Sequence, residues 1–293
     1  MIGIVLNPVS GGGKGKALAD EAAALLASRG EEARIYESAC EGGITERVRE
    51  AIAEGCGGVA CIGGDGSLSE AVQALCGSGV VFYVIPAGTG NDFARALGLP
   101  KDSMEAFRAQ LEGQPAAIDC GLLNGKAFIN ISGSGFDVRV LERTEELKAD
   151  YPGEQAYRKA VSDTIRHYVP FSPEIEIDGK RLESGAYAIA EIANGQYFGG
   201  GMRVAPDAQL DDGLFDVVLV RAVPRLTIPL LFPLFILGLH TRLPLAKQYR
   251  AKKVCLRAPG MTINIDGRLE RMDEGHYEIC PGALRMMRPI KTA

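Results

Sequence analysis

Three glycine-rich segments each follow closely on a short apolar run, and this arrangement limits the fold more than any other feature of the sequence. The runs are residues 3–7, 58–62 and 80–86, and helical patterns and one further strand, residues 33–37, lie between them. Short apolar strands that alternate with helices are typical of βαβ units, in which helices cover both faces of a parallel sheet. Ligands of such sheets bind where the carboxyl ends of the strands meet. We therefore expect the glycine segments to form one ligand site.

The first glycine segment, residues 7–15, reads NPVSGGGKG and suits an anionic phosphate. Consecutive glycines let backbone N–H groups converge, and the helix that follows presents its positive N-terminus. Ser10 and Ala17 stand where a Walker loop requires Gly and Ser or Thr, and Lys16 stands where the dinucleotide fingerprint requires its third glycine. The segment is therefore a phosphate loop of another kind, and the alternative is a plain glycine turn.

The other two glycine segments add carboxylates to the same edge of the sheet. Residues 63–67, GGDGS, place Asp65 between glycines, so that the backbone approaches a ligand while the acid points outward. Residues 86–95, PAGTGNDFAR, add Asp92, together with a threonine and an asparagine that can hydrogen-bond phosphate or ribose. A carboxylate beside phosphates serves mainly to hold Mg²⁺. The alternative for the second segment is a turn whose acid or serine caps the next helix.

Beyond about residue 119 the pattern changes to strands with few helices between them. Asp-Gly pairs at residues 178–179, 212–213 and 266–267 are typical of tight turns between such strands. The expected strands are residues 127–133, 173–178, 186–194, 214–220, 251–257 and 261–266, and the expected helices are residues 138–147 and 154–168. This pattern predicts a mainly antiparallel β-sandwich.

The change of pattern predicts two domains. The first is an α/β domain over residues 1–122, with a parallel sheet between two layers of helices, and residues 284–293 are expected to rejoin it. The second is the sandwich, over residues 123–283.

Composition narrows the class of function. A net charge of −5 argues against nucleic acid as a partner, because phosphate contacts demand a basic surface. The seven cysteines form no CxxC pair and no metal-ligand spacing, and the three histidines add nothing to them. The chain start lacks the features of a secretion signal, and no apolar stretch reaches the roughly 18 to 20 residues of a spanning helix. We therefore expect a soluble cytoplasmic protein with reduced thiols.

One region of this acidic chain is basic and strongly apolar. Residues 217–264 contain no Asp or Glu but eight Lys or Arg, and residues 226–239 within them are apolar almost throughout. Pro229 and Pro233 argue against a straight helix there. A run of this length is commonly a buried core segment, whereas beside basic residues it also suits an interfacial segment at anionic headgroups. We expect transient membrane contact through residues 217–264, and exposed strand edges would allow a homodimer.

The motifs, in this order and spacing, resemble the diacylglycerol kinase catalytic domain family, which sphingosine and ceramide kinases share. The resemblance covers nearly the whole chain, and soluble bacterial lipid kinases are the most similar members. It continues through residues 133–137 (GSGFD), 194–202 (NGQYFGGGM), 204–208 (VAPDA) and 210–213 (LDDG). The GGDG motif also occurs in NAD kinases, whose fold is similar. The family implies an NAD-kinase-like first domain followed by a β-sandwich that takes the lipid.

The resemblance also implies a reaction: transfer of the γ-phosphate of ATP, with Mg²⁺, to the hydroxyl of a membrane-resident lipid such as diacylglycerol. ATP would lie in the crevice between the domains. The residues implied around the nucleotide are Asn7, Ser10, Gly11, Lys14, Ser38, Gly63, Gly64, Asp65, Gly66, Ser67, Gly88, Thr89, Gly90, Asn91 and Asp92. Asp65, Asp92 and Asp211 would form the acidic cluster for Mg²⁺ and the accepting hydroxyl. A structural Mg²⁺ would be held by the Asp212 side chain and by backbone at Gln209 and Leu214.

One departure from the family pattern concerns catalysis. The family has a Glu, a supposed catalytic acid, directly after the Asp-Gly pair, but this chain has Arg268 there and Glu270 two residues later. Arginine cannot accept a proton. Our hypothesis is that Glu270 substitutes; otherwise Asp211 acts alone, or the usual substrate is no longer turned over.

Two other functions therefore stay open beside the lipid kinase. One is a non-catalytic regulator that binds lipid or nucleotide, which the arginine would explain. The other is an NAD kinase, which accounts for the GGDG motif but leaves the apolar segment and its basic surroundings without a role. The acceptor lipid is equally open among diacylglycerol, a sphingoid base, ceramide and a polyprenol.

Overall fold

The apolar runs of the first 86 residues form parallel strands in the order β4-β3-β1-β2. A computed structural model describes residues 1–8, 13–40, 42–151 and 154–290. The elements of this part are β1 (Ile2–Leu6), α1 (Gly15–Ser28), β2 (Ala33–Glu37), α2 (Ile44–Ala53), β3 (Gly58–Gly63), α3 (Asp65–Leu75), β4 (Val81–Pro86), α4 (Asp92–Ala96) and α5 (Ser103–Leu111). Helices α1 and α5 pack on one face of the sheet, and α2 and α3 pack on the other. The sheet is therefore covered on both faces, as predicted, and this confirms the fold class.

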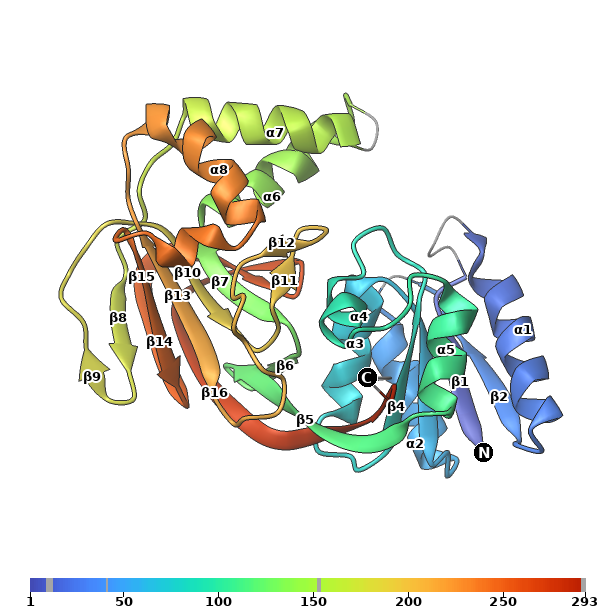
Figure 1. The fold of residues 1–293 in the computed structure, drawn as a ribbon. Coiled ribbons are helices and arrows are strands. Elements are labelled where there is room, and N and C mark those ends of the chain that lie inside the picture. Colours follow the sequence, from blue (N-terminus) through green and yellow to red (C-terminus); the bar gives the residue numbers. More distant parts are fainter. Residues whose placement is uncertain (9–12, 41, 152–153, 291–293) are drawn as a thin grey trace.

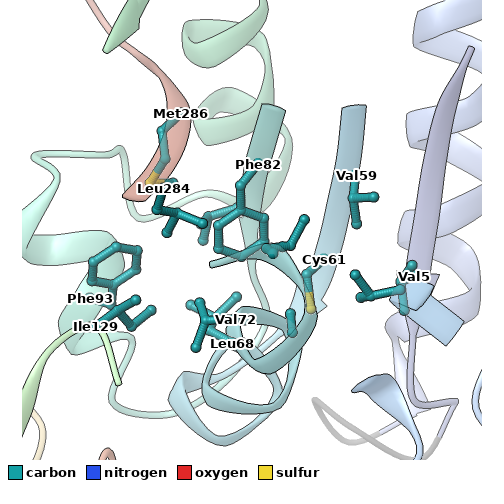
Figure 2. Close-up of a cluster of buried hydrophobic side chains, with 14 of the residues drawn as sticks. Val5, Val59, Cys61, Leu68, Val72, Phe82, Phe93, Ile129, Leu284 and Met286 are labelled. Carbon is teal, nitrogen blue, oxygen red and sulfur yellow. The ribbon is translucent and has the colours of Figure 1, made fainter. Parts of the chain in front are cut away.

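A hydrophobic core lies on each face of this sheet, and one of the two is made by apolar side chains of α2, α3 and the strands. Leu68 and Val72, four residues apart and thus on one face of α3, pack with Phe82 of β4 (Figure 2). Leu284 and Met286, from the end of the chain, join the same cluster. Burial of each such side chain contributes about 1.5 to 3 kcal/mol. The end of the chain is thus part of the core of the first domain.

Two long strands, β5 (Gln114–Leu123) and β16 (Arg268–Arg288), run antiparallel to each other between the domains (Figure 1). At its far end β16 pairs in parallel with β4, where Arg285 lies opposite Val81. The pairing makes one continuous sheet through both domains. The predicted boundary near residue 122 falls at the end of β5.

The second domain is an antiparallel ladder with three helices on one side (Figure 1). Strand order across it is β14-β13-β10-β7-β15-β16. Its elements are β6 (Lys126–Phe128), β7 (Ile131–Gly135), α6 (Phe136–Leu147), α7 (Glu154–Arg166), β8 (Glu174–Ile177), β9 (Lys180–Arg181), β10 (Tyr187–Ala193), β11 (Tyr197–Phe198), β12 (Met202–Arg203), β13 (Phe215–Arg221), η2 (Arg225–Thr227), α8 (Ile228–Ile236), η3 (Leu239–Arg242), β14 (Ala246–Ala251) and β15 (Lys253–Ile265). The Asp178-Gly179 and Asp266-Gly267 pairs join β8 to β9 and β15 to β16, with positive φ at both positions. These are the tight hairpin turns that the sequence predicts.

Two expectations for this domain were wrong in detail. The strand predicted over residues 127–133 is two strands, β6 and β7, because Asp266 accepts the backbone N–H groups between them. The strands predicted over residues 251–257 and 261–266 are one strand, β15, with an irregular register between Arg257 and Met261.

The apolar segment does not form one straight helix, because it is divided among η2, α8 and η3. Pro229 lies in the first turn, where a backbone N–H has no helical partner to lose, so only Pro233 removes a hydrogen bond. Even so, none of the described helices is both long and apolar enough to cross a membrane.

Candidate active site

The second and third glycine loops, which follow β3 and β4, pack backbone against backbone. A Cβ added to Gly88 would lie 2.5 Å from the Cα of Gly64, and one added to Gly63 would lie 2.4 Å from the Cβ of Ser67. Neither position can therefore carry a side chain without moving a loop. Asn91 holds the second of these loops in a left-handed turn, with φ of 49°, and accepts the N–H of Gly88 at 3.0 Å.

Two of the predicted acids meet at this junction. Asp65 Oδ1 accepts the N–H of Phe93 at 3.0 Å, and Asp92 Oδ2 accepts the N–H of Gly200 at 2.7 Å. Arg95 pairs with the other oxygen of Asp92. Burial raises the pKa of Asp92, the Gly200 N–H and Arg95 lower it, and the charge of Asp65 raises it further. The acids are thus close enough to repel each other, and a cation would relieve that repulsion.

A third carboxylate, Asp266, faces the same region from the β15–β16 turn. It accepts three backbone N–H groups, those of Ile129, Asn130 and Ile131, at 2.8 to 3.0 Å. Burial raises its pKa to about 6 against the opposing effect of those N–H groups, and the charge of Asp65 adds to the rise. Asp266 therefore fixes the edge of the second domain beside the acids of the first.

A cavity of about 320 Å³ extends from these carboxylates into the second domain. Asp65, Asp92 and Asp266 line it on one side. Most of the remaining lining is apolar and comes from β7, β10 and β13 and from the helices α6, α7 and α8, including Phe136, Val140, Tyr157, Ile189, Val220, Leu231, Phe232 and Phe235. The space thus joins an acidic edge to an apolar interior.

One acidic pair lies within the apolar part. Asp137, at the start of α6, lines the cavity and contacts Glu191 of β10, and both are buried. None of their four side-chain oxygens has a well-aligned hydrogen-bond partner among the described residues. Burial raises the pKa of both, and burial together with the adjacent charge of Asp137 raises that of Glu191 well above its ordinary value. The apolar part of the cavity therefore holds two carboxyl groups whose ionisation is disfavoured.

Helix α8 presents apolar side chains in two directions. Leu231, Phe232 and Phe235 line the cavity, whereas Leu230 is 75% exposed. Leu226 and Leu237, on either side of the helix, are also exposed. The helix is therefore neither a fully buried core segment nor an ordinary surface helix.

The turn at Asp212, where a structural metal ion is predicted, lies elsewhere in the second domain and brings several charged side chains together. Asp212 pairs with Arg250 and accepts the N–H of Leu214 at 3.1 Å, and Gln209 is exposed beside this turn. Asp216 lies 3.7 Å from Arg250, and one of its oxygens is buried without a hydrogen-bond partner among the described residues. Burial raises the pKa of Asp216 to about 6, Arg250 lowers it, and Asp212 raises it. An orphan carboxylate oxygen beside a second carboxylate suits a hard cation.

Two predicted catalytic acids lie apart from the cavity. Asp211 pairs with Arg288 at 2.8 Å, and Glu270 pairs with Lys126 at 2.5 Å. Neither is among the described residues that line the cavity. Arg268 donates to the Ser69 hydroxyl at 3.2 Å. Of the three acids predicted to be catalytic, Asp65 alone lies at the described cavity.

The other predicted nucleotide residues that the structure describes lie at or just after the carboxyl ends of the parallel strands. Asn7 follows β1, Lys14 directly precedes α1, and Ser38 follows β2 and donates to the Cys40 carbonyl at 2.5 Å. Ser10 and Gly11 lie outside the described residues. On the second and third loops, Gly66 and Thr89 are exposed and Ser67 and Gly90 are half-buried.

Sequence patterns did not single out two acids that shape the site. Asp119 of β5 accepts the N–H groups of Gly213 and Gly282 at 2.6 and 2.8 Å, which ties the predicted metal turn to β16. Glu191 occupies the space that the missing side chain of Gly133 leaves. The available signal for Glu191 was its position inside an apolar strand pattern, and this signal does not reveal that Asp137 is its neighbour.

These observations define a class: a two-domain fold in which an acidic edge of a parallel sheet faces an apolar cavity. Residues 1–123 match the family described as "Diacylglycerol kinase catalytic domain", and residues 130–288 match the "YegS C-terminal NAD kinase beta sandwich-like domain". The chain belongs to this family of lipid kinases.

Individual relatives agree with this assignment, and solved structures share the fold. The chain is 31% identical over 289 residues to "Diacylglycerol kinase" of Mycobacterium tuberculosis (strain ATCC 25618 / H37Rv), covering 97% of this chain and 93% of that protein. It is 33% identical over 228 residues to "Diacylglycerol kinase" of Bacillus subtilis (strain 168), covering 74% and 73%. A diacylglycerol kinase structure from Bacillus anthracis str. Sterne aligns with a TM-score of 0.75 at 19% identity, covering 100% of this chain and 98% of the other. An NAD kinase from Archaeoglobus fulgidus in complex with ATP aligns with a TM-score of 0.56 at 15% identity, covering 99% and 95%. The latter two show the fold alone.

Proposed function

We propose that the chain transfers the γ-phosphate of ATP to the hydroxyl of a lipid whose acyl chains occupy the apolar cavity. The observation that carries this proposal is the continuity of the cavity from Asp65 and Asp92 to Phe232 and Phe235. A lipid alcohol needs both parts, because its hydroxyl must reach the phosphate while its chains leave water. An NAD kinase would have no use for the apolar part.

The glycine loops would hold the phosphates, and the acids beside them would position the accepting hydroxyl. Asp65 Oδ1 is held by the Phe93 N–H, which leaves Oδ2, the oxygen beside Gly90, for a ligand. Asp92 and Asp65 together suit Mg²⁺, since both are hard oxygen donors and Arg95 balances only one of the two charges. When bound, Mg²⁺ would neutralise charge on the transferring phosphate. The protein itself contributes positioning and exclusion of water.

A second, structural Mg²⁺ is proposed at the Asp212 turn. Asp212 and Asp216 would supply carboxylate oxygens, with backbone at Gln209 and Leu214 completing the set. The orphan oxygen of Asp216 is the observation that favours it. Arg250 already balances part of this charge, so the ion would have to displace or share that guanidinium.

Membrane contact is proposed through α8 and the segments on either side of it. Leu226, Leu230 and Leu237 are exposed although they are apolar, and Arg225 and Arg242 lie on the adjoining η2 and η3. Exposed apolar side chains beside cations suit the surface of an anionic bilayer. The same helix that walls the cavity would then touch the membrane that holds the substrate.

The direct test is transfer of labelled phosphate from Mg-ATP to micelles of diacylglycerol, a sphingoid base, ceramide or a polyprenol. We expect one phosphorylated lipid. Asp211→Ala and Glu270→Ala, assayed beside wild type, decide which acid cooperates with Asp65. Wild-type turnover in Glu270→Ala would end the hypothesis that Glu270 replaces the family Glu.

The same assay tests the alternative of a non-catalytic regulator, which Arg268 motivates. If no lipid is phosphorylated while ATP still binds, the regulator becomes the better proposal. Substitution of Arg268 by Glu should then restore turnover, because it would return an acid to that position.

A further inference from the structure

A cysteine, a glutamate and a histidine meet on the outer face of the β15–β16 hairpin. Val254 and Leu256 of β15 point into the sandwich core, so Cys255 between them points outward. His276 lies directly opposite Cys255 on β16, and Glu274 lies two residues along the same face. Their ligand atoms all lie within 4.8 Å of one another, and no other such group of three occurs among the described residues.

The separations match those of a metal site. In a zinc site the metal bonds are about 2.3 Å to sulfur and about 2.0 Å to nitrogen or oxygen. With tetrahedral angles, a carboxylate oxygen then lies about 3.5 Å from the thiolate sulfur and about 3.3 Å from the imidazole nitrogen. Cys255 Sγ lies 3.5 Å from Glu274 Oε1, and His276 Nε2 lies 2.9 Å from the same oxygen. Side-chain shifts of a few tenths of an ångström would make room for the ion.

The cluster already holds a cation. Arg257 Nε lies 2.5 Å from Glu274 Oε1, and its guanidinium also reaches Glu176 of β8 at 3.8 Å. The guanidinium therefore occupies the place of a positive charge among carboxylates, a thiol and an imidazole. It is a competitor that a metal ion would displace, while Glu176 remains to accept it.

We propose that Cys255, Glu274 and His276 bind a thiophilic divalent cation of the zinc class, with water in the fourth position. As the Sγ–metal bond forms, the thiol gives its proton to solvent, so binding releases one proton per ion. Cysteine and histidine with a single carboxylate favour zinc over Mg²⁺, which prefers oxygen alone.

The site is separate from the kinase cavity. Cys255 lies near the start of β15, whereas the Asp266-Gly267 turn that lines the cavity follows its end. Strand β8, which pairs with β15 opposite Cys255, lies on the side of the second domain away from the first (Figure 1). A bound ion would therefore crosslink β15 to β16, and it would raise the stability of the sandwich.

The experiment is titration of the purified, metal-free full chain with Zn²⁺ by calorimetry, and with Co²⁺ by absorption spectroscopy. We expect one ion per chain with a Kd of about 1 µM or tighter, a thiolate-to-cobalt charge-transfer band, and a higher unfolding temperature with zinc. Cys255→Ser and His276→Gln should each weaken binding by at least about 100-fold. His276 is exposed, so its substitution tests the site without disturbing the core.

Two matched variants make the result decisive. Arg257→Gln removes the competing guanidinium and should tighten zinc binding, an outcome that non-specific binding to a thiol would not give. Cys40→Ser removes an exposed cysteine elsewhere and should change nothing. The proposal is overturned if no saturable binding occurs, or if binding survives unchanged in Cys255→Ser and His276→Gln.

Discussion

The two domains line one cavity with different kinds of groups. The first domain contributes backbone: Gly64 and Gly88 touch directly, and their loops present N–H groups and two carboxylates. The second domain contributes apolar side chains. Some come from the helix α8, such as Phe232 and Phe235, and others come from one face of the sheet.

The difference indicates where change is tolerated. A surface made by backbone contact has no room for an added side chain, so in the proposed reaction it would position phosphate and hydroxyl. A surface made by apolar side chains can be reshaped by exchanging one for another, so it would select the acceptor lipid. Substitution of the acids of the first domain should therefore lower kcat, whereas substitution in the second domain should change lipid affinity or stability.

The largest expected effect is on the acid of the first domain. Asp65→Ala should lower kcat for lipid phosphorylation by at least about 1000-fold, about 4 kcal/mol, because it removes a charge that acts mainly in the transition state. The unfolding temperature should change little. Asp20→Ala, which removes an exposed acid of α1, is the matched control and should keep full activity. Turnover retained in Asp65→Ala would locate the chemistry elsewhere.

A smaller effect is expected at the contact of the two loops. Gly88→Ala should destabilise the protein by about 2 to 3 kcal/mol, because the new Cβ would lie 2.5 Å from the Cα of Gly64. Urea denaturation measures this. Gly57→Ala is the control, since its Cβ would meet nothing within 4 Å, and it should be nearly neutral. Equal stability of the two variants would contradict the close loop contact.

The third prediction concerns charge in the second domain. The pKa of Asp216 is raised from 3.8 to about 6, so its ionisation opposes folding. Its stabilising contribution is present below pH 3.8 and is lost as pH rises through about 6. With a chelator at pH 7.5, Asp216→Asn should therefore be more stable than wild type by about 2 kcal/mol, and near pH 4 the two should agree.

Added Mg²⁺ sharpens this comparison. If the ion binds at the Asp212 turn, it should stabilise wild type at pH 7.5 more than Asp216→Asn, since that variant lacks one carboxylate ligand, whereas any stabilisation through Asp65 and Asp92 is common to both. Urea denaturation at both pH values, with and without Mg²⁺, separates the outcomes. A wild type that is more stable than Asp216→Asn in chelator would show that the buried charge is compensated.

The first domain was the easier to predict, because its signals are local. The strand at residues 33–37 was predicted with the bounds of β2, and the acids of the glycine segments lie where their strands end. In the second domain, the hairpins at Asp178-Gly179 and Asp266-Gly267 were equally predictable, since only a few residue types tolerate positive φ. Each signal is complete within a few residues.

The second domain was harder, because its important contacts join distant positions. Cys255 and His276 have no metal-ligand spacing in sequence, and the β15–β16 register alone brings them opposite each other. Asp137 and Glu191 are 54 residues apart, and the strand pairing of β7 with β10 decides that they meet. The sequence predicted only that no straight helix covers residues 226–239. It did not predict the short helix α8, where tertiary packing on the cavity outweighs the hydrogen bond lost at Pro233.

The smallest expected effect comes from substitutions that distinguish the exposed apolar face of α8 from the face that lines the cavity. Leu230 is 75% exposed, whereas its neighbour Leu231 lines the cavity. Leu231→Ala should raise KM for the lipid by about 10-fold in micelles, because about 1 to 2 kcal/mol of apolar contact is lost. Leu230→Ala should leave that KM unchanged.

Vesicle binding should show the reverse. In co-sedimentation with anionic vesicles, Leu230→Ala should weaken binding by about 5-fold, and Leu231→Ala should not, because only the exposed leucine would enter the bilayer. Neutral vesicles should bind wild type less, since Arg225 and Arg242 would then have no anionic partner. If wild-type binding is independent of anionic lipid and both variants behave alike, α8 is only a wall of the cavity.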